Sequence, residues 1–275
     1  MPGENTVAIV QGRMSSSRLP GKVLLDLAGR PMLERVIERT RRARTLDLVA
    51  VATTRDASDD PVEAFCRERG YPVFRGELFD VLDRFYQAAR RFDAGVVVRI
   101  TGDCPVIDPE LIDATVRLLR PPVDFACNRL PPPWKRTFPI GLDVEACRFD
   151  LLERAWREAD QKFQREHVMP FIYEGVNFKG TGTQFPVKTG VSQRGFQIAQ
   201  LDHDPDLGSL RWTVDTPQDL EVMQSVFAHF GRDDFSWQEL LALQQSQPEI
   251  FALNAGVEHR SAFDVDERQK KDRDA

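Results

Sequence analysis

The loop after the first apolar segment of the chain concentrates side chains that can bind an anion. In VQGRMSSSRLPGKVL (residues 10–24), Arg13, Arg18 and Lys22 supply three positive charges, and three serines supply hydroxyl donors. Its two glycines allow the backbone to approach a phosphate or to take a positive φ. The spacing fits neither a Walker loop nor a G-x-G-x-x-G loop. By composition alone, the loop is either an anion cradle or a solvated turn.

Two aspartates directly follow strand-like segments and could bind a divalent cation. Asp103 lies three residues after the segment 95–100, and Asp108, which precedes a proline, is the better helix cap. Asp215 ends LRWTVD and precedes Thr216, so a capping role is equally open there. Two carboxylates from separate strand ends, with phosphate oxygens and water, would complete an octahedral Mg²⁺ shell.

Weaker candidates follow in the second half of the chain. Asp143 and Glu145 lie two apart in PIGLDVEAC, so a strand would place both on one face, which could also be an exposed face. Arg165, Glu166 and His167 stand together in QREHVMPFIY, although a lone histidine is more often structural than catalytic.

Alternating strand-like and helical segments must position these residues. Near-continuous apolar strands alternating with amphipathic helices predict a parallel sheet covered on both faces. We expect strands at 6–10, 46–52, 72–74 and 95–100, and helices at 31–44, 61–70, 81–92 and 109–119.

The alternation breaks after residue 120, where a proline-rich stretch leads into a strand-like segment ending at 147. We predict one domain over residues 1–262, in which residues 121–208 form an inserted acceptor-site and dimerisation subdomain. The charged residues 263–275 predict a disordered tail. The later expected elements are helices at 149–159, around 166–174, at 217–230 and at 236–245. FPVKTGV, FQIAQL and LRWTVD are expected strands, for which an antiparallel arrangement is one option.

Composition limits the classes of protein that the chain can represent. Its 275 residues are 41% hydrophobic, which is enough for a sizeable core, and its net charge of -6 argues against a general nucleic-acid binder. Its four cysteines form no C-x-x-C pair and suit a reduced compartment. No signal peptide and no apolar run of about 20 residues occurs. We therefore expect a cytoplasmic protein with no nucleic-acid or membrane partner.

Taken together, the motifs resemble those of the cytidylyltransferases that make CMP-activated acidic sugars, such as the acylneuraminate and 3-deoxy-manno-octulosonate cytidylyltransferases. The loop AIVQGRMSSSRLPGKVL carries the resemblance to the superfamily. The spore coat polysaccharide biosynthesis protein F subgroup has a similar ordered set of motifs, which here reads GRPMLERVIERTRRA, VFRGELFDVLDRFYQAA, VVVRITGDCPVIDP, PIGLDVEAC, REHVMPFIY and LRWTVDTPQDLE. The resemblance spans roughly residues 5–230. It implies an α/β fold: a Rossmann-like three-layer α/β/α sandwich of the nucleotide-diphospho-sugar transferase type, with a mostly parallel mixed sheet.

The resemblance also implies an activity and roles for individual residues. The activity would be Mg²⁺-dependent transfer of CMP from CTP to a small acidic acceptor, with release of pyrophosphate, by a homodimer. Lys22, Arg13 and Asp103 would be catalytic, and Asp103 and Asp215 would hold Mg²⁺. The nucleotide would be bound by Gln11, Gly12, Arg13, Ser15, Ser16, Arg18, Lys22, Arg75, Thr101 and Gly102. The acceptor would face Asn128, Asp143, Glu145, Arg165, Glu166 and His167.

The loop departs from the common family form in two places. Gly12 replaces an alanine, and Ser15–Ser16 replaces Gly-Ser. Both changes keep small residues, so the loop still suits phosphate, whereas the fit around the base can differ. Two alternatives are a glycosyltransferase on a related fold, whose diphosphate donor would not need this loop, and a non-catalytic nucleotide-binding protein. The general base is either a substrate hydroxyl or an acidic residue such as Asp103.

Overall fold

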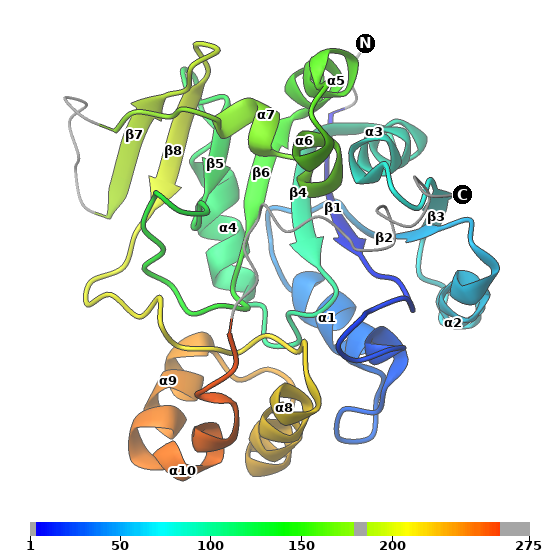
Figure 1. Ribbon diagram of the computed structural model, residues 1–275, viewed down its shortest axis with the longest axis vertical. Coiled ribbons are helices and arrows are strands. Elements are labelled where there is room, and N and C mark those ends of the chain that lie inside the picture. Colours follow the sequence, from blue (N-terminus) through cyan, green and yellow to red (C-terminus); the bar gives the residue numbers. More distant parts are fainter. Residues whose placement is uncertain (1–3, 179–185, 259–275) are drawn as a thin grey trace, which may run out of the picture.

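A single twisted sheet forms the centre of the molecule (Figure 1). The structure is a computed structural model that describes residues 4–178 and 186–258. Within these residues the sheet has eight strands in the order β3-β2-β1-β4-β6-β5-β8-β7. The first half is parallel, as the sequence predicts, and comprises β1 (Asn5–Gln11), β2 (Leu48–Thr54), β3 (Val73–Gly76) and β4 (Ala94–Thr101).

The predicted insertion extends this sheet. Strand β6 is antiparallel to both β4 and β5, β5 is parallel to β8, and β7 is antiparallel to β8. As a result β4 and β5 end at the same edge of the sheet, and β6 begins there. These strands are β5 (Phe125–Cys127), β6 (Glu145–Arg148), β7 (Val187–Val191) and β8 (Gln197–Leu201).

Helices cover both faces because side chains alternate along each strand. On β1, Ala8 and Val10 enter one apolar cluster, whereas Val7 and Ile9 enter the other. The first cluster is closed by α1 (Met32–Thr40), α2 (Asp60–Glu68), α4 (Pro109–Arg117), α8 (Pro217–Phe230), α9 (Trp237–Ser246) and α10 (Pro248–Phe251). The second is closed by α3 (Val81–Arg91), α5 (Phe149–Glu158) and α7 (Pro170–Tyr173), with α6 (Lys162–His167) against α3. The three-layer sandwich is therefore confirmed.

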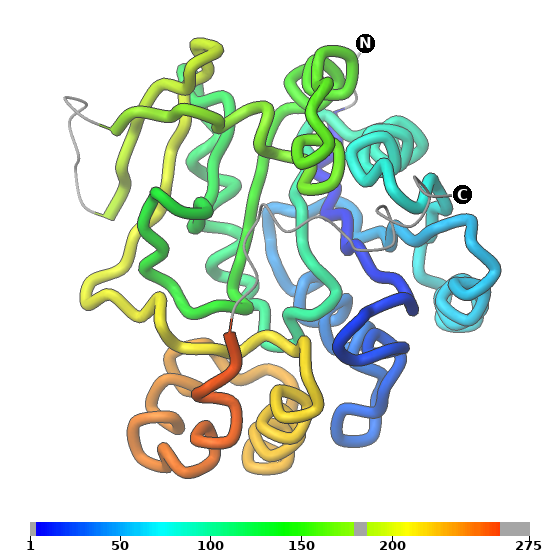
Figure 2. Tube along the Cα trace, viewed as in Figure 1, coloured from blue at the N-terminus to red at the C-terminus, as the bar shows by residue number. Residues whose placement is uncertain are grey.

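The chain traced in Figure 2 places α8, α9 and α10 beyond the carboxyl ends of the parallel strands, at the bottom of the view. The segments after β1, β4 and β5 meet this group of helices at the same edge. None of the helices in the described ranges is long and apolar enough to cross a membrane.

Three predicted elements differ from the structure. LRWTVD is not a strand: Arg211 makes one isolated bridge with Ile140, and the other residues of this segment are irregular. Asp143 precedes β6 and does not lie on it, so the alternation of a strand does not place it beside Glu145. The helix expected around 166–174 is divided into α6 and α7. The predicted tail, residues 263–275, lies outside the described residues.

Candidate active site

One lysine joins the two predicted metal-binding aspartates at the carboxyl edge of the sheet. The Lys22 ammonium donates to Asp103 Oδ2 at 2.9 Å, to Asp215 Oδ1 at 2.8 Å and to the Val214 carbonyl at 2.8 Å. Only 10% of the Lys22 side chain is exposed. Residues separated by almost 200 positions therefore meet at one nitrogen, and Lys22 of the opening loop contacts both carboxylates.

The mutual attraction of these groups changes their protonation. Burial alone would lower the pKa of Lys22, but Asp103 and Asp215 outweigh it and raise that pKa above its ordinary value. Burial alone would likewise raise the pKa of Asp215, but Lys22, Arg18 and Arg211 hold it well below the usual range. Lys22 and Asp215 are therefore both charged at neutral pH.

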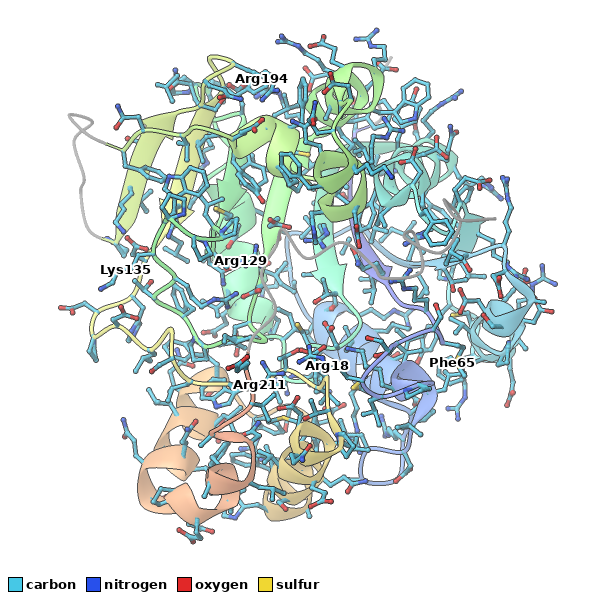
Figure 3. The ribbon with its side chains drawn as sticks, viewed as in Figure 1. Arg18, Phe65, Arg129, Lys135, Arg194 and Arg211 are labelled. Carbon is cyan, nitrogen blue, oxygen red and sulfur yellow. The ribbon has the colours of Figure 1, made fainter. Side chains whose placement is uncertain are left out.

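A second layer of contacts fixes Asp215. Arg18 pairs with Asp215 Oδ2 at 2.9 Å, and Arg211 reaches the same oxygen at 3.0 Å. The fully buried Asp219 accepts the Asp215 backbone N–H at 3.0 Å and pairs with Arg211 at 2.8 Å. Thr216 caps α8, so the cap that the sequence left open belongs to Thr216. Figure 3 shows Arg18 and Arg211 near each other below the sheet.

Asp59, which the sequence did not single out, holds the backbone of the opening loop. The carboxylate of Asp59, which is fully buried, accepts the backbone N–H of Met14 at 2.7 Å and contacts Thr54 at the end of β2. The loop also closes on itself, since the Gly21 N–H donates to the Met14 carbonyl at 2.8 Å and Gly21 has a φ of +71°.

Gly102 brings the ends of β1 and β4 together. Its N–H donates to the Gln11 carbonyl at 2.8 Å, and an added Cβ would lie 2.8 Å from that same oxygen. Only glycine allows this approach without displacing the backbone. The loop after β1 and Asp103 are thereby placed on adjacent chains.

The donor set at this edge suits Mg²⁺. Mg²⁺ prefers carboxylate oxygens and keeps several waters or phosphate oxygens in its shell. Asp103 and Asp215 provide two such carboxylates, already close enough to share one cation. The described ranges contain no group of three or more His, Cys, Asp or Glu that could hold a metal. The pair therefore fits an ion that takes most of its remaining ligands from a nucleotide and water.

Comparison with known proteins agrees with this geometry. The family model described as cytidylyltransferase matches residues 7–199. This chain belongs to the cytidylyltransferase family. An uncharacterized protein of Methanocaldococcus jannaschii is 34% identical over 95% of this chain and 99% of its own length. The spore coat polysaccharide biosynthesis protein SpsF of Bacillus subtilis is 30% identical over 88% of this chain and 94% of its own.

A solved structure gives the same assignment. A cytidylyltransferase from Leptospira borgpetersenii superposes with a TM-score of 0.78 at 28% identity, covering 93% of this chain and 99% of that one. The expected enzyme class and fold are therefore confirmed: the chain is a nucleotidyltransferase on a three-layer α/β fold.

The residues predicted to bind nucleotide in this cytidylyltransferase lie mostly together. Gln11 and Thr101 are paired in register at the ends of β1 and β4. Burial is the main cause that lowers the pKa of Arg84 to about 10, and the nearby charge of Arg13 is the second cause. Arg75 pairs with Asp60 and Glu63 at 2.7 Å and donates to the Thr54 carbonyl at the end of β2, so it lies beside the support of the loop and not in the loop itself. Those remaining in or beside the loop are Gly12, Ser15, Ser16, Arg18, Lys22 and Gly102.

The predicted acceptor residues are divided between two places. Asp143 and Glu145 lie at the carboxyl edge, where Asp143 pairs with Arg136 at 2.8 Å and Glu145 with Arg99. Asn128 is fully buried, and its amide bonds the Leu142 carbonyl at 2.7 Å and the Val144 N–H at 2.9 Å.

The remaining three acceptor candidates lie on α6. Arg165 forms a two-pronged ion pair with Asp80, which caps α3, at distances that include 3.1 Å. Glu166 and His167 are the last two residues of α6 and are half-buried. Arg165 thus ties α6 to α3 in the structure.

Two arginines near the candidate site carried no recognisable sequence signal. Arg99 lies within the apolar strand β4, and its Nε donates to Gln11 Oε1 at 3.0 Å. Arg129 follows β5 and contacts Asp143 at 3.3 Å. Each is a single cation in an otherwise apolar or proline-rich stretch, so only the pairing of the strands shows that both lie near Asp143 and Glu145.

Proposed function

We propose that this cytidylyltransferase transfers CMP from CTP to an acidic sugar or a similar small acceptor, using Mg²⁺ and releasing pyrophosphate. The observation that supports the proposal most is the convergence of Lys22, Asp103 and Asp215 within 2.9 Å. A phosphate-binding cation beside two metal-type carboxylates is the arrangement that nucleotidyl transfer requires. The resemblance to enzymes that activate sugar acids supports the acceptor class.

In the proposed reaction, an acceptor oxygen attacks the α-phosphorus of CTP in line, and the bond to the pyrophosphate oxygen breaks. Bound Mg²⁺, held by Asp103 and Asp215, would neutralise phosphate charge. Lys22 and Arg18 provide N–H donors and positive charge on the loop side, while Asp59 and Gly102 keep the loop beside β4. Because triphosphate charge repels the nucleophile, neutralisation and positioning supply most of the catalysis.

A panel assay tests the proposal. Each of the four nucleoside triphosphates is incubated with Mg²⁺ and a set of acidic sugars and small phosphorylated or phosphonate acids, and pyrophosphate is measured. We expect release that requires CTP, an acceptor and Mg²⁺, and that stops when EDTA is added. Release of a nucleoside diphosphate from a sugar nucleotide would instead indicate a glycosyltransferase. Tight CTP binding without turnover would indicate a nucleotide-binding protein.

We also propose a cytoplasmic homodimer that supplies a precursor for a surface polysaccharide or glycan. The name of the Bacillus subtilis relative supports the polysaccharide role. Light scattering on the eluting protein tests the assembly: a mass near twice 31.3 kDa is expected, and a mass of one chain would contradict it.

A further inference from the structure

Arg129 lies at the same edge of the sheet as the proposed reaction centre. It stands two residues beyond the end of β5, as Asp103 stands two residues beyond the end of β4, and both strands end on the same side. In Figure 3, Arg129 lies near the centre of the molecule, above Arg18 and Arg211. Its place in the fold is therefore beside the site, on the side formed by the insertion.

The carboxylates around Arg129 are already neutralised by other arginines. Asp143 accepts two hydrogen bonds from Arg136, one of them at 2.8 Å, and Glu145 pairs with Arg99. Arg129 makes one contact, from its Nε to Asp143 Oδ2 at 3.3 Å. Its two Nη groups have no hydrogen-bond partner among the described residues. Three guanidinium groups therefore face two carboxylates, which leaves one positive charge in excess.

This excess charge is enclosed but can still be reached. The Arg129 side chain is 18% exposed, although protein surrounds it. Burial would lower the pKa of Arg129, but Asp143 and Glu145 outweigh burial and raise it, so the group stays charged. A cation withdrawn from bulk water without a full partner is costly, and a bound anion would offset that cost.

Backbone contacts connect the segment around Asp143 to the reaction centre. The Trp212 N–H donates to the Ile140 carbonyl, three residues before Asp143, at 2.7 Å. The Val214 N–H donates to the Asp103 carbonyl at 2.9 Å. Asp103 and the Asp143 that Arg129 contacts therefore belong to segments that both pair with residues 212–214. A small molecule bound through Arg129 would lie alongside the proposed metal-binding carboxylates.

We propose that Arg129 binds the carboxylate of the acceptor and thereby selects acidic acceptors. The free Nη edge of a guanidinium can give two parallel hydrogen bonds to a carboxylate, which combines charge with orientation. One bound carboxylate would cancel the single excess charge. This role rests on the proposed CMP transfer and makes Arg129 a specificity-determining residue.

The test compares acids with their methyl esters as acceptors. Pyrophosphate release is measured at saturating CTP with N-acetylneuraminate and 3-deoxy-manno-octulosonate, and with the methyl ester of each. We expect wild-type kcat/KM to favour the acid by about 100-fold. Arg129→Met should raise the KM for the acid by at least tenfold, leave the KM for CTP within twofold and bring the acid-to-ester ratio close to one. Arg129→Lys should restore part of that ratio.

Arg148→Met is the matched control, because Arg148 pairs with Asp124 at 2.6 Å and lies outside the charge cluster of Arg129, Asp143 and Glu145. It removes a guanidinium of the same kind and should leave the acid-to-ester ratio unchanged. An unchanged ratio in Arg129→Met, or an equal fall in Arg148→Met, would overturn the inference. So would a wild-type enzyme that releases pyrophosphate from CTP only with uncharged acceptors, although the proposed transfer would then stand. Absence of pyrophosphate release with every acceptor would refute the proposed function itself.

Discussion

At the scale of single residues, Lys22 connects the opening loop to the segments that carry Asp103 and Asp215. Two carboxylates and a carbonyl accept from one ammonium, and Gly21 before it has the positive φ that turns the loop inward. In the proposed reaction, Mg²⁺ held by the aspartates would free Lys22 to bind phosphate oxygens. We expect Lys22 to neutralise the two carboxylates in the free protein and to donate hydrogen bonds to phosphate in the complex.

Lys22→Met should lower the rate of pyrophosphate release by about 10² or more, because one preorganised cation at the developing charge is lost. Stopped or continuous pyrophosphate assays measure the rate, and circular dichroism checks that the variant is folded. Lys188→Met is the control, since Lys188 also pairs with a buried aspartate, Asp202, but on β7 away from the site. Equal losses in both variants would contradict a catalytic role for Lys22.

Asp215 gives the protein an acid-dependent part of its stability. Its pKa is depressed in the folded state, so its stabilising effect is complete above the unfolded value near 3.9 and is lost as pH falls through the folded value. Asp215→Asn should lower the free energy of unfolding at pH 7 by about 3 kcal/mol, because Lys22 and Arg18 lose a charged partner. Urea denaturation from pH 7 to pH 2 should show this difference shrinking below pH 4. A difference that grows on acidification would contradict the assignment.

The sequence predicted those candidate residues that belong to a recognisable motif. Lys22, Asp103 and Asp215 each follow a strand-like segment and belong to recognisable stretches. Arg129 and Asp59 do not: Asp59 sits in a run of aspartates that reads as an ordinary helix start. Their partners are 14 and 45 residues away, so only the folded chain shows which charge each one meets.

At the scale of elements, Asp59 couples the opening loop to the end of β2. Asp59→Asn should weaken CTP binding by about tenfold to 100-fold, because a buried charged acceptor of the Met14 N–H becomes a neutral amide. Calorimetric titration with CTP measures the affinity. Asp56→Asn, which alters the exposed cap of the neighbouring turn, should leave it within twofold. Unchanged affinity in Asp59→Asn would show that the loop does not depend on this contact.

The elements that the sequence predicted well are those formed by local patterns. The continuous apolar runs of β1, β2 and β4 and the proline-started helices α4 and α8 lie within a few residues of the expected positions. LRWTVD failed because its alternation of apolar residues serves packing against α8 and α9, not strand pairing: Trp212 and Val214 are fully buried in that cluster. Apolar periodicity indicates which side chains are buried, but it does not indicate whether a paired strand or a helix covers them.

At the scale of the whole molecule, the sheet joins the two halves of the chain. Strands β4 and β6 are joined by four residue pairs, from Val96–Arg148 to Arg99–Glu145. The predicted insertion therefore shares backbone pairing and an apolar cluster with the first half of the chain. The charge balance follows the same pattern. A chain of net charge -6 gathers the cations Lys22, Arg18 and Arg129 at one edge, where a nucleotide and an acidic acceptor would bring compensating negative charge.

This continuity predicts one cooperative unfolding transition and not two. If residues 121–208 were a separate unit, heating would melt it independently, whereas strands shared within one sheet must separate together. Differential scanning calorimetry should therefore give a single peak.

CTP with Mg²⁺ at 100 times its Kd should raise the free energy of unfolding by about 2.7 kcal/mol and move the whole peak to higher temperature, because the ligand binds only the folded form. Arg148→Ala, which removes the contact from β6 to Asp124 outside the site, should lower the peak without dividing it. Two peaks, of which only one moves with CTP, would show that the insertion folds independently of the nucleotide-binding half.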